Sequence, residues 1–224
     1  MNHPPSGRYI PGVAYLELWR YEARRCGAAA LSLPLLAAAL VAAASLTARS
    51  VGAADSETIG FGIVRLITTL LPVAAGLGIA AALGRERAIE LQLSVPTPYR
   101  TTVLRRIAAV AAVVVLASAV AIIEAALLGY WSHPATGVLA LIVPLGPALM
   151  LVGMGAWSQV MLQSTAGASA VVLGAWLFQL LILDRFIVVW QINRALLAIA
   201  GGLLVVLALR RLDDTEHLLR GGTE

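Results

Sequence analysis

The sequence predicts an all-α integral membrane protein with six transmembrane helices. Apolar residue types make up 60% of the 224 residues, charged types make up 12%, and the mean hydropathy is +0.88. A soluble domain is about 45–50% apolar and about 25% charged, so this composition excludes an ordinary soluble fold. The apolar residues are also gathered into six long runs, and most of the charged residues lie between these runs.

Each apolar run is long enough to cross a bilayer as a helix. About 20 residues at 1.5 Å per residue cover the roughly 30 Å of hydrocarbon. The runs must be helical because backbone polar groups find no water partner in lipid. Proline and glycine inside them are acceptable, since both are common in membrane helices. We expect the spans at residues 27–48, 60–84, 107–129, 135–158, 165–183 and 187–209.

The arginines predict the orientation of the spans. All 16 basic residues are arginine, and basic residues collect on the cytoplasmic side of membrane proteins. With a cytoplasmic N-terminus, twelve arginines lie inside and only Arg49, Arg65, Arg185 and Arg194 lie outside. We therefore expect a multi-pass protein with both termini in the cytoplasm. Abundant Ala, Val and Arg without Lys are typical of a GC-rich bacterial genome, which places the chain in a bacterial inner membrane.

The segments outside the spans divide the chain into three parts. Residues 1–26 form a cytoplasmic N-terminus, whose end from Tyr15 onward predicts an amphipathic helix lying in the membrane interface. A frayed cytoplasmic start of the first span is the alternative interpretation of this end. Residues 27–210 form the transmembrane domain, and residues 211–224 form a cytoplasmic tail.

The cytoplasmic loop between the second and third spans is the longest and most charged loop. Residues 85–95 contain good helix formers and neither Gly nor Pro, and two prolines follow them. Glu86 and Glu90 share one helical face, while Ile89 and Leu93 form a separate apolar stripe. The loop therefore predicts a short cytoplasmic helix with a polar edge for a partner and an apolar edge that packs toward the membrane.

At this loop the sequence resembles the type-2 ABC transporter permeases, the membrane subunits of mostly bacterial exporters. The family pattern is an acidic residue, a second Glu, an apolar-rich stretch, and then a Pro and a basic residue leading into the third span. The matching residues are Glu86, Glu90, Leu91, Leu93, Pro96, Tyr99 and Arg100. Arg87, Ala88 and Ile89 depart from the pattern, which often has Gly or Thr after the first acid. The six spans, cytoplasmic termini and N-terminal amphipathic helix also look like this family.

The resemblance implies that residues 85–95 are a coupling helix held in a cleft of a separate ATP-hydrolysing subunit. The residues implied in ATPase coupling are Glu86, Arg87, Glu90, Leu91, Leu93 and Arg100. The implied assembly has two permease halves, identical or different, and two cytoplasmic ABC ATPase chains. ATP and Mg²⁺ are implied on the ATPase, and this chain is expected to be no enzyme and to bind no cofactor or metal. A chain without lysine cannot form a nucleotide-binding P-loop of its own.

Two charged residues and one polar group near the outer side are candidates for a role in the membrane. Arg65 and Glu124 lie at similar depths in the second and third spans, and a charge at a span centre costs about 2.5–3.5 kcal/mol. We predict that they form an ion pair, as a structural bridge or an outer gate, with snorkelling to the interface as the alternative. Gln191, Asn193 and Arg194 are predicted at an outer vestibule or in an interfacial polar cluster.

The sequence thus predicts the permease subunit of an ABC exporter. Spans with few polar groups favour a hydrophobic or amphipathic cargo. One alternative is a stand-alone secondary transporter, which would need ionisable groups near the membrane centre. Another is a non-transporting scaffold or immunity subunit. Nucleic acid is not an expected partner, because the arginines flank apolar runs. Residues 184–194 remain open between a shortened re-entrant segment and the start of the sixth span.

Overall fold

A computed structural model describes residues 26–51, 57–84, 99–187 and 189–219, and these residues are helical apart from short connections. Their elements are α2 (Ala28–Ser50), α3 (Glu57–Gly84), α5 (Tyr99–Leu127), the 3₁₀ helix η1 (Gly137–Leu141), α6 (Ile142–Leu162), α7 (Thr165–Phe178), the π-helical segment η2 (Gln179–Leu183), α8 (Asp184–Phe186) and α9 (Trp190–Leu219). The predicted interfacial helix before the first span and the predicted helix at residues 85–95 lie outside the described residues.

The prediction of six spans is confirmed: six helical segments are long and apolar enough to cross a membrane. They are Ala28–Ser50, Glu57–Gly84, Arg100–Leu127, Gly137–Leu162, Thr165–Phe186 and Trp190–Leu212. Large apolar side chains, among them Leu40, Leu116 and Ile199, are about 60% exposed on the outside of the bundle. Such a surface suits lipid and not water. The chain is therefore a multi-pass helical membrane protein in contact with a lipid bilayer.

The span boundaries differ from the sequence prediction where charges lie at helix ends. The apolar run of the third span begins at residue 107, whereas its helix begins at Tyr99, so Arg105 and Arg106 belong to the helix. A hydropathy pattern stops at charged residues, whereas a helix continues through them when their side chains find partners. At the other end of the chain, α9 continues to Leu219, so most of the predicted tail extends the last helix.

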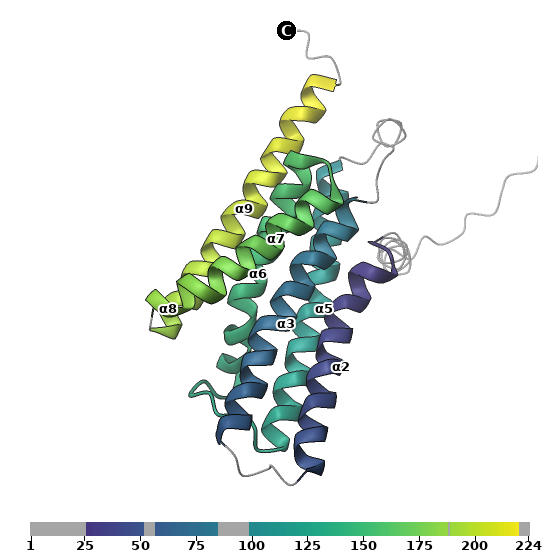
Figure 1. The fold of residues 1–224 in the computed structure, drawn as a ribbon. Helices are drawn as coiled ribbons and strands as arrows, with labels where there is room; N and C mark the ends of the chain where they lie inside the picture. The colour runs from purple at the N-terminus through teal and green to yellow at the C-terminus, as the bar shows by residue number, and fades with distance from the viewer. Residues whose placement is uncertain (1–25, 52–56, 85–98, 188, 220–224) are drawn as a thin grey trace, which may run out of the picture.

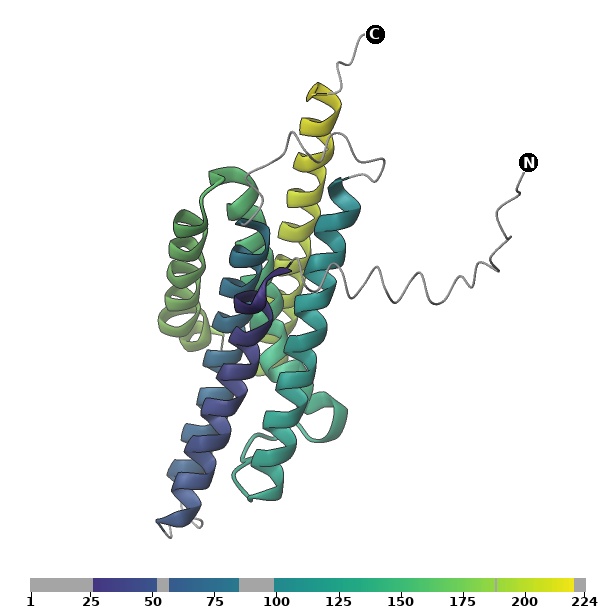
Figure 2. The ribbon, with the colours of Figure 1, turned by 90° about the vertical axis from the view of Figure 1, so that its right-hand side faces the viewer.

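The helices form a bundle in which α6 is central (Figures 1 and 2). α6 packs mainly on α9 and α3, α2 packs on α3 and α5, and α7 packs on α6 and α3. The end of α3, the start of α5, the α6–α7 connection and the C-terminal end of α9 gather at one end, which we call the predicted cytoplasmic end. The C-terminal part of α9 projects beyond the other helices there. The opposite end is called the predicted outer end.

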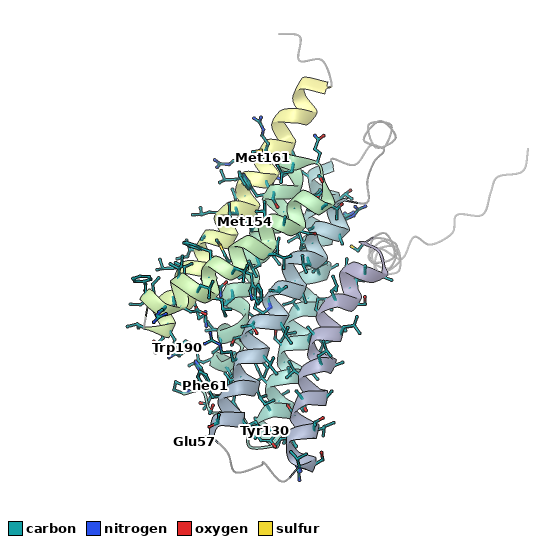
Figure 3. All side chains as sticks on the ribbon, in the orientation of Figure 1. Glu57, Phe61, Tyr130, Met154, Met161 and Trp190 are labelled. Atoms are coloured by element: carbon teal, nitrogen blue, oxygen red, sulfur yellow. The ribbon has the colours of Figure 1, made fainter. Side chains whose placement is uncertain are left out.

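The turn that contains α8 does not reach the predicted outer end. Figures 1 and 2 both show it at mid-height along α3 and α5, so α2, α3 and α5 continue past it. In Figure 3, Trp190 at the start of α9 lies well above Glu57 and Tyr130. The outer half of the molecule is therefore built on α2, α3 and α5 with η1 packed against them, and α6, α7 and α9 lie mainly in the half toward the cytoplasmic end.

Two apolar cores correspond to these two halves. One core lies toward the predicted cytoplasmic end and combines α2, α3, α5, α6 and α9, with Ile79, Val110 and Ala156 fully buried. The other lies in the outer half and includes Val41, Ile67 and Tyr130.

Glycines let α6 and α9 meet backbone to backbone. A Cβ atom at Gly153 would collide with the Gly201 carbonyl, and a Cβ atom at Gly201 would collide with the Leu149 carbonyl. Small residues at helix contacts are the usual means of close packing in membranes. The neighbouring Gly202 faces open space, because a Cβ atom there would meet nothing within 4 Å.

This contact predicts opposite effects for two adjacent substitutions. Gly201→Ala should destabilise the protein by about 2 kcal/mol, because a backbone carbonyl occupies the space of the new methyl group. Gly202→Ala should stabilise it by about 0.5–1 kcal/mol, because alanine favours a helix and meets nothing here. The measurement is the Tm of the purified full chain. Equal shifts in Tm for the two variants would contradict the α6–α9 contact.

Candidate functional site

Of the residues predicted to couple to an ATPase, only Arg100 is described by the structure. It is exposed in the first turn of α5. Glu86, Arg87, Glu90, Leu91 and Leu93 lie outside the described residues, so their predicted role remains a prediction. What the structure does describe is how the two ends of their segment are held.

Arg106 connects α5 to the last turn of α3. Its side chain is 1% exposed, and its Nη1 donates a hydrogen bond to the Ala82 carbonyl oxygen at 3.3 Å. The last carbonyls of a helix lack partners within the helix and carry partial negative charge. A guanidinium at this position therefore satisfies one of them and fixes the start of α5 against the end of α3.

The end of α3 is also wedged against the α6–α7 connection. A Cβ atom at Gly84 would collide with Oγ1 of Thr165 and would lie 3.3 Å from Nε2 of Gln159. The connection itself is tight, because Gln163 ends α6 in the left-handed region at φ 50°. The Ser164 hydroxyl then accepts a hydrogen bond from the Gly167 amide, which caps α7. We call the contacts of Ala82, Gly84, Arg106, Gln159 and Thr165 the α3–α5 junction.

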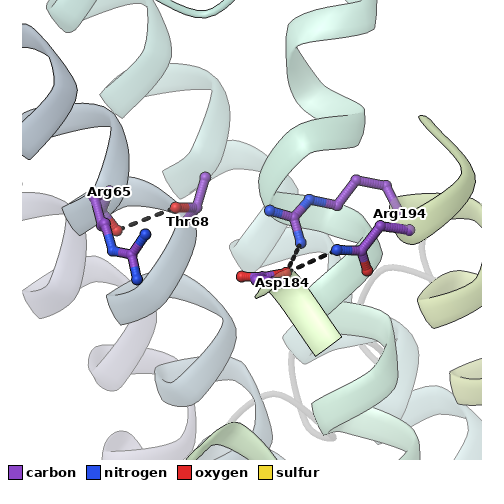
Figure 4. Close-up of polar contacts among 5 residues, drawn as sticks. Arg65, Thr68, Asp184 and Arg194 are labelled. Atoms are coloured by element: carbon purple, nitrogen blue, oxygen red, sulfur yellow. Dashed lines mark hydrogen bonds and ion pairs between the residues drawn. The ribbon is translucent and has the colours of Figure 1, made fainter. Parts of the chain in front are cut away.

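The predicted ion pair between Arg65 and Glu124 is not formed among the described residues. Arg65 is exposed, and both carboxylate oxygens of Glu124 are buried without a hydrogen-bond partner in that part of the chain. Two residues at similar depth in the membrane do not necessarily lie on the facing sides of their two helices. The packed face of α3 contains Ile63 and Ile67, and Arg65 points away from it. Its carbonyl accepts a hydrogen bond from the Thr68 hydroxyl at 3.1 Å (Figure 4).

A second charged pair, which the sequence did not single out, forms at the α8 turn. Oδ1 of Asp184 accepts hydrogen bonds from Nδ2 of Asn193 at 2.8 Å and from Nη1 of Arg194 at 3.0 Å (Figure 4). The side chains of Arg194 and Asp184 are 12% and 24% exposed, respectively. Asn193 is buried, whereas Gln191 is exposed and points elsewhere. Two of the three predicted vestibule residues therefore point inward, to an acid.

The local backbone explains why these residues meet. The helix breaks at Ile187, whose φ of −101° and ψ of 86° are not helical, and α9 begins at Trp190. The chain therefore folds back within a few residues and brings Asp184 beside the first turn of α9. Gly146 of α6 allows the close approach of that turn, because a Cβ atom there would lie 2.7 Å from the Arg194 carbonyl oxygen.

His133 is packed beside the same turn. Its ring lies edge-on to Trp190, with 4.9 Å between the ring centroids, and 5.9 Å from the ring of Trp131. Nδ1 of His133 accepts a hydrogen bond from the Ala135 amide at 3.1 Å. Burial lowers the pKa of His133, and the positive charge of Arg194 lowers it further. The side chain is therefore held neutral beside the charged pair.

We call Asp184, Asn193, Arg194, His133 and Trp190 the polar turn. The sequence contains one signal that finds its acid: Asp184 is the acid at the end of an apolar run, ten residues before Arg194. His133 has no such signal, because it lies far from this turn in the sequence. Within the described ranges, no group of three or more His, Cys, Asp or Glu side chains could hold a metal ion.

Comparison with known proteins assigns no family to this chain. No protein-family model matches the chain, and no curated protein or solved structure matches it either.

The charged pair predicts that Asp184 stabilises the turn. Asp184→Leu should cost about 2 kcal/mol, because it removes hydrogen bonds to a charged partner and leaves Arg194 with no acid in a largely buried position. Arg185→Leu is the matched control, since Arg185 is exposed in the same turn, and it should change stability by less than about 0.5 kcal/mol. Thermal unfolding of the two variants makes the comparison, and equal losses would contradict the role of the pair.

The lowered pKa of His133 predicts a pH-dependent stability. In the unfolded chain the imidazole returns to its ordinary pKa of 6.5 and takes up a proton more readily than in the folded protein. The stability that a neutral His133 contributes is complete above pH 6.5 and is lost as the pH falls toward the lower folded pKa. His133→Gln should reduce the drop in Tm between about pH 7.5 and about pH 5.5. An unchanged drop would show that His133 protonates equally in both states.

Proposed function

We propose that this chain is the membrane-spanning permease subunit of an ABC exporter of the type-2 family. In this proposal both termini face the cytoplasm of a bacterial cell, and the chain lies in the inner membrane. Residues 85–95 dock on a cytoplasmic ABC ATPase, which binds ATP and Mg²⁺. The chain itself performs no catalysis. It converts the closure of the ATPase subunits into a movement of the spans.

The α3–α5 junction is the observation that carries this proposal. The segment that contains Glu86 and Glu90 joins two helices whose ends lie at the same end of the bundle. Both ends are packed: Gly84 abuts Thr165, and Arg106 hydrogen-bonds the Ala82 carbonyl. A docking segment needs this kind of attachment, because a loosely held segment would absorb a partner's movement.

A force on this segment would reach three helices at once. α3 and α5 carry its two ends, and the contact of Gly84 with Thr165 passes the displacement to the start of α7. Close-packed interiors shift between discrete arrangements and do not deform continuously. The junction therefore supports the conversion of a movement at the cytoplasmic surface into a rearrangement of spans.

The apolar surface of the bundle supports two parts of the proposal, a hydrophobic or amphipathic cargo and a second permease subunit. Apolar side chains on α2, α5, α7 and α9 are exposed, and lipid together with a second permease half, identical or different, would cover them. An exporter built this way accepts hydrophobic or amphipathic cargo from the bilayer.

The polar turn favours one other function, that of a stand-alone secondary transporter. Such proteins hold their coupling ions near the middle of the membrane, and the turn lies at mid-height along α3 and α5 (Figure 1). Transport in that case would follow an ion gradient and would need no ATPase. The pairing of Asp184 with Arg194 weighs against it, because a coupling acid must exchange its partner for the ion.

The test compares Glu90 of the proposed docking segment with Glu57 at the first turn of α3. The chain is expressed with a candidate ABC ATPase from the same genome, and the ATPase recovered with the purified chain is measured. Glu90→Ala should lower the affinity of the two proteins about tenfold, because it removes a charged hydrogen-bonding group from the docking face. Glu57→Ala, at the first turn of α3, should leave it unchanged. Equal recovery with both variants, or export without any ATPase, would overturn the proposal.

A further inference from the structure

An apolar cavity of about 370 Å³ lies between α6, α7 and α9. Its walls include Met150 and Met154 from α6, Val171 and Phe178 from α7, Leu183 from η2 and Leu197 from α9. Methionine side chains are flexible and adapt to ligands of different shape. The volume is at the lower end of the range for small-molecule pockets, so it suits one hydrocarbon chain better than a two-chain lipid.

One polar side chain lines this cavity. Gln179 is 5% exposed, and its buried Oε1 accepts no hydrogen bond from the described residues. The oxygen has no accessible surface, so the part of the amide that a ligand can reach is Nε2, which donates hydrogen bonds. Gln179 also begins the π-helical segment η2, and π-helical turns occur frequently at functional sites.

The α7 wall of the cavity is open at Gly174. A Cβ atom there would meet nothing within 4 Å, so the missing side chain leaves space in the wall. Val171, Ala175 and Phe178 continue the same helical face on either side of it. The cavity is therefore a slot along α7, with its amide near the α8 end and its two methionines on the facing helix.

We propose that this slot binds a single-chain amphiphile taken from the bilayer, with a hydroxyl or carbonyl oxygen that accepts a hydrogen bond from Nε2 of Gln179. The hydrocarbon tail lies against Met150, Met154 and Val171. The identification of this ligand as cargo rests on the proposed permease function, whereas the binding site itself does not.

The probes for the test are a photoreactive long-chain alcohol and the photoreactive alkane of the same length, which keeps the chain but lacks the oxygen. The full chain is placed in nanodiscs of phosphatidylcholine, and labelling is mapped to α6 and α7. We expect the alcohol to bind about tenfold more tightly than the alkane, because only the alcohol has an oxygen that accepts a hydrogen bond from Gln179. Equal binding of the two probes would overturn the proposal.

Two variants and a matched control locate the site. Gln179→Leu should lower the alcohol's affinity to that of the alkane and leave the alkane unchanged. Gly174→Leu should abolish labelling by both probes, because the new side chain fills the slot without striking the backbone. Gly202→Leu, which also enters open space but on α9, should have no effect. Undiminished labelling of Gly174→Leu, or full displacement of the alcohol by added phosphatidylethanolamine, would overturn the proposal.

The binding assay contains no ATPase, so its outcome is independent of the permease assignment. In the assembled complex, the alcohol should stimulate ATP hydrolysis, and Gly174→Leu should remove this stimulation while Gly202→Leu keeps it. Labelling without stimulation would support the binding site and overturn its role in export.

Discussion

The arrangement of the described helices depends on backbone contact along both sides of α6. On one side, Gly153 meets Gly201 of α9, and on the other, a Cβ atom at Gly155 would lie 2.7 Å from the Gly76 carbonyl oxygen of α3. Side chains larger than hydrogen would separate the helices at these points. In a membrane, where lipid tails compete equally for apolar surfaces, such close approach supplies the packing that holds helices together.

The central position of α6 also determines where the polar turn, the α3–α5 junction and the slot lie. Gly146 admits the first turn of α9 and so sets Arg194 beside Asp184, while Gln159 near the other end of α6 lies against the end of α3. α7 meets α3 and α6 through a side chain, because a Cβ atom at Gly76 would lie 2.7 Å from Cγ1 of Val172 and one at Gly155 would lie 3.4 Å from its Cγ2. The slot lies between α6, α7 and α9, and Met150 and Met154 line it from α6.

The six spans could be predicted from the sequence because lipid leaves a long apolar run no alternative to a helix. The direction in which each side chain points from its helix could not be predicted from the sequence. Arg65 and Glu124 are alike in depth, but only the packing of Ile63 and Ile67 decides that Arg65 points away. The pairing of Asp184 with Arg194 depends on a break at Ile187 that apolar residues on both sides conceal. A hydropathy pattern indicates how deep a residue lies in the membrane, whereas a functional site also depends on which way its side chain points.

Under the proposed function, α7 links the two ends of the mechanism. It begins at Thr165, which abuts Gly84 at the α3–α5 junction, and it ends at η2, where Gln179 lines the slot. A displacement of residues 85–98 would therefore shift the start of the helix that forms one wall of the slot. α6 meets α3 and α9 backbone to backbone, whereas α7 meets α6 through the Val172 side chain, so α7 is the wall that can shift more readily relative to α6. A change in the width of the slot then follows from the same movement that an ATPase would impose at the junction.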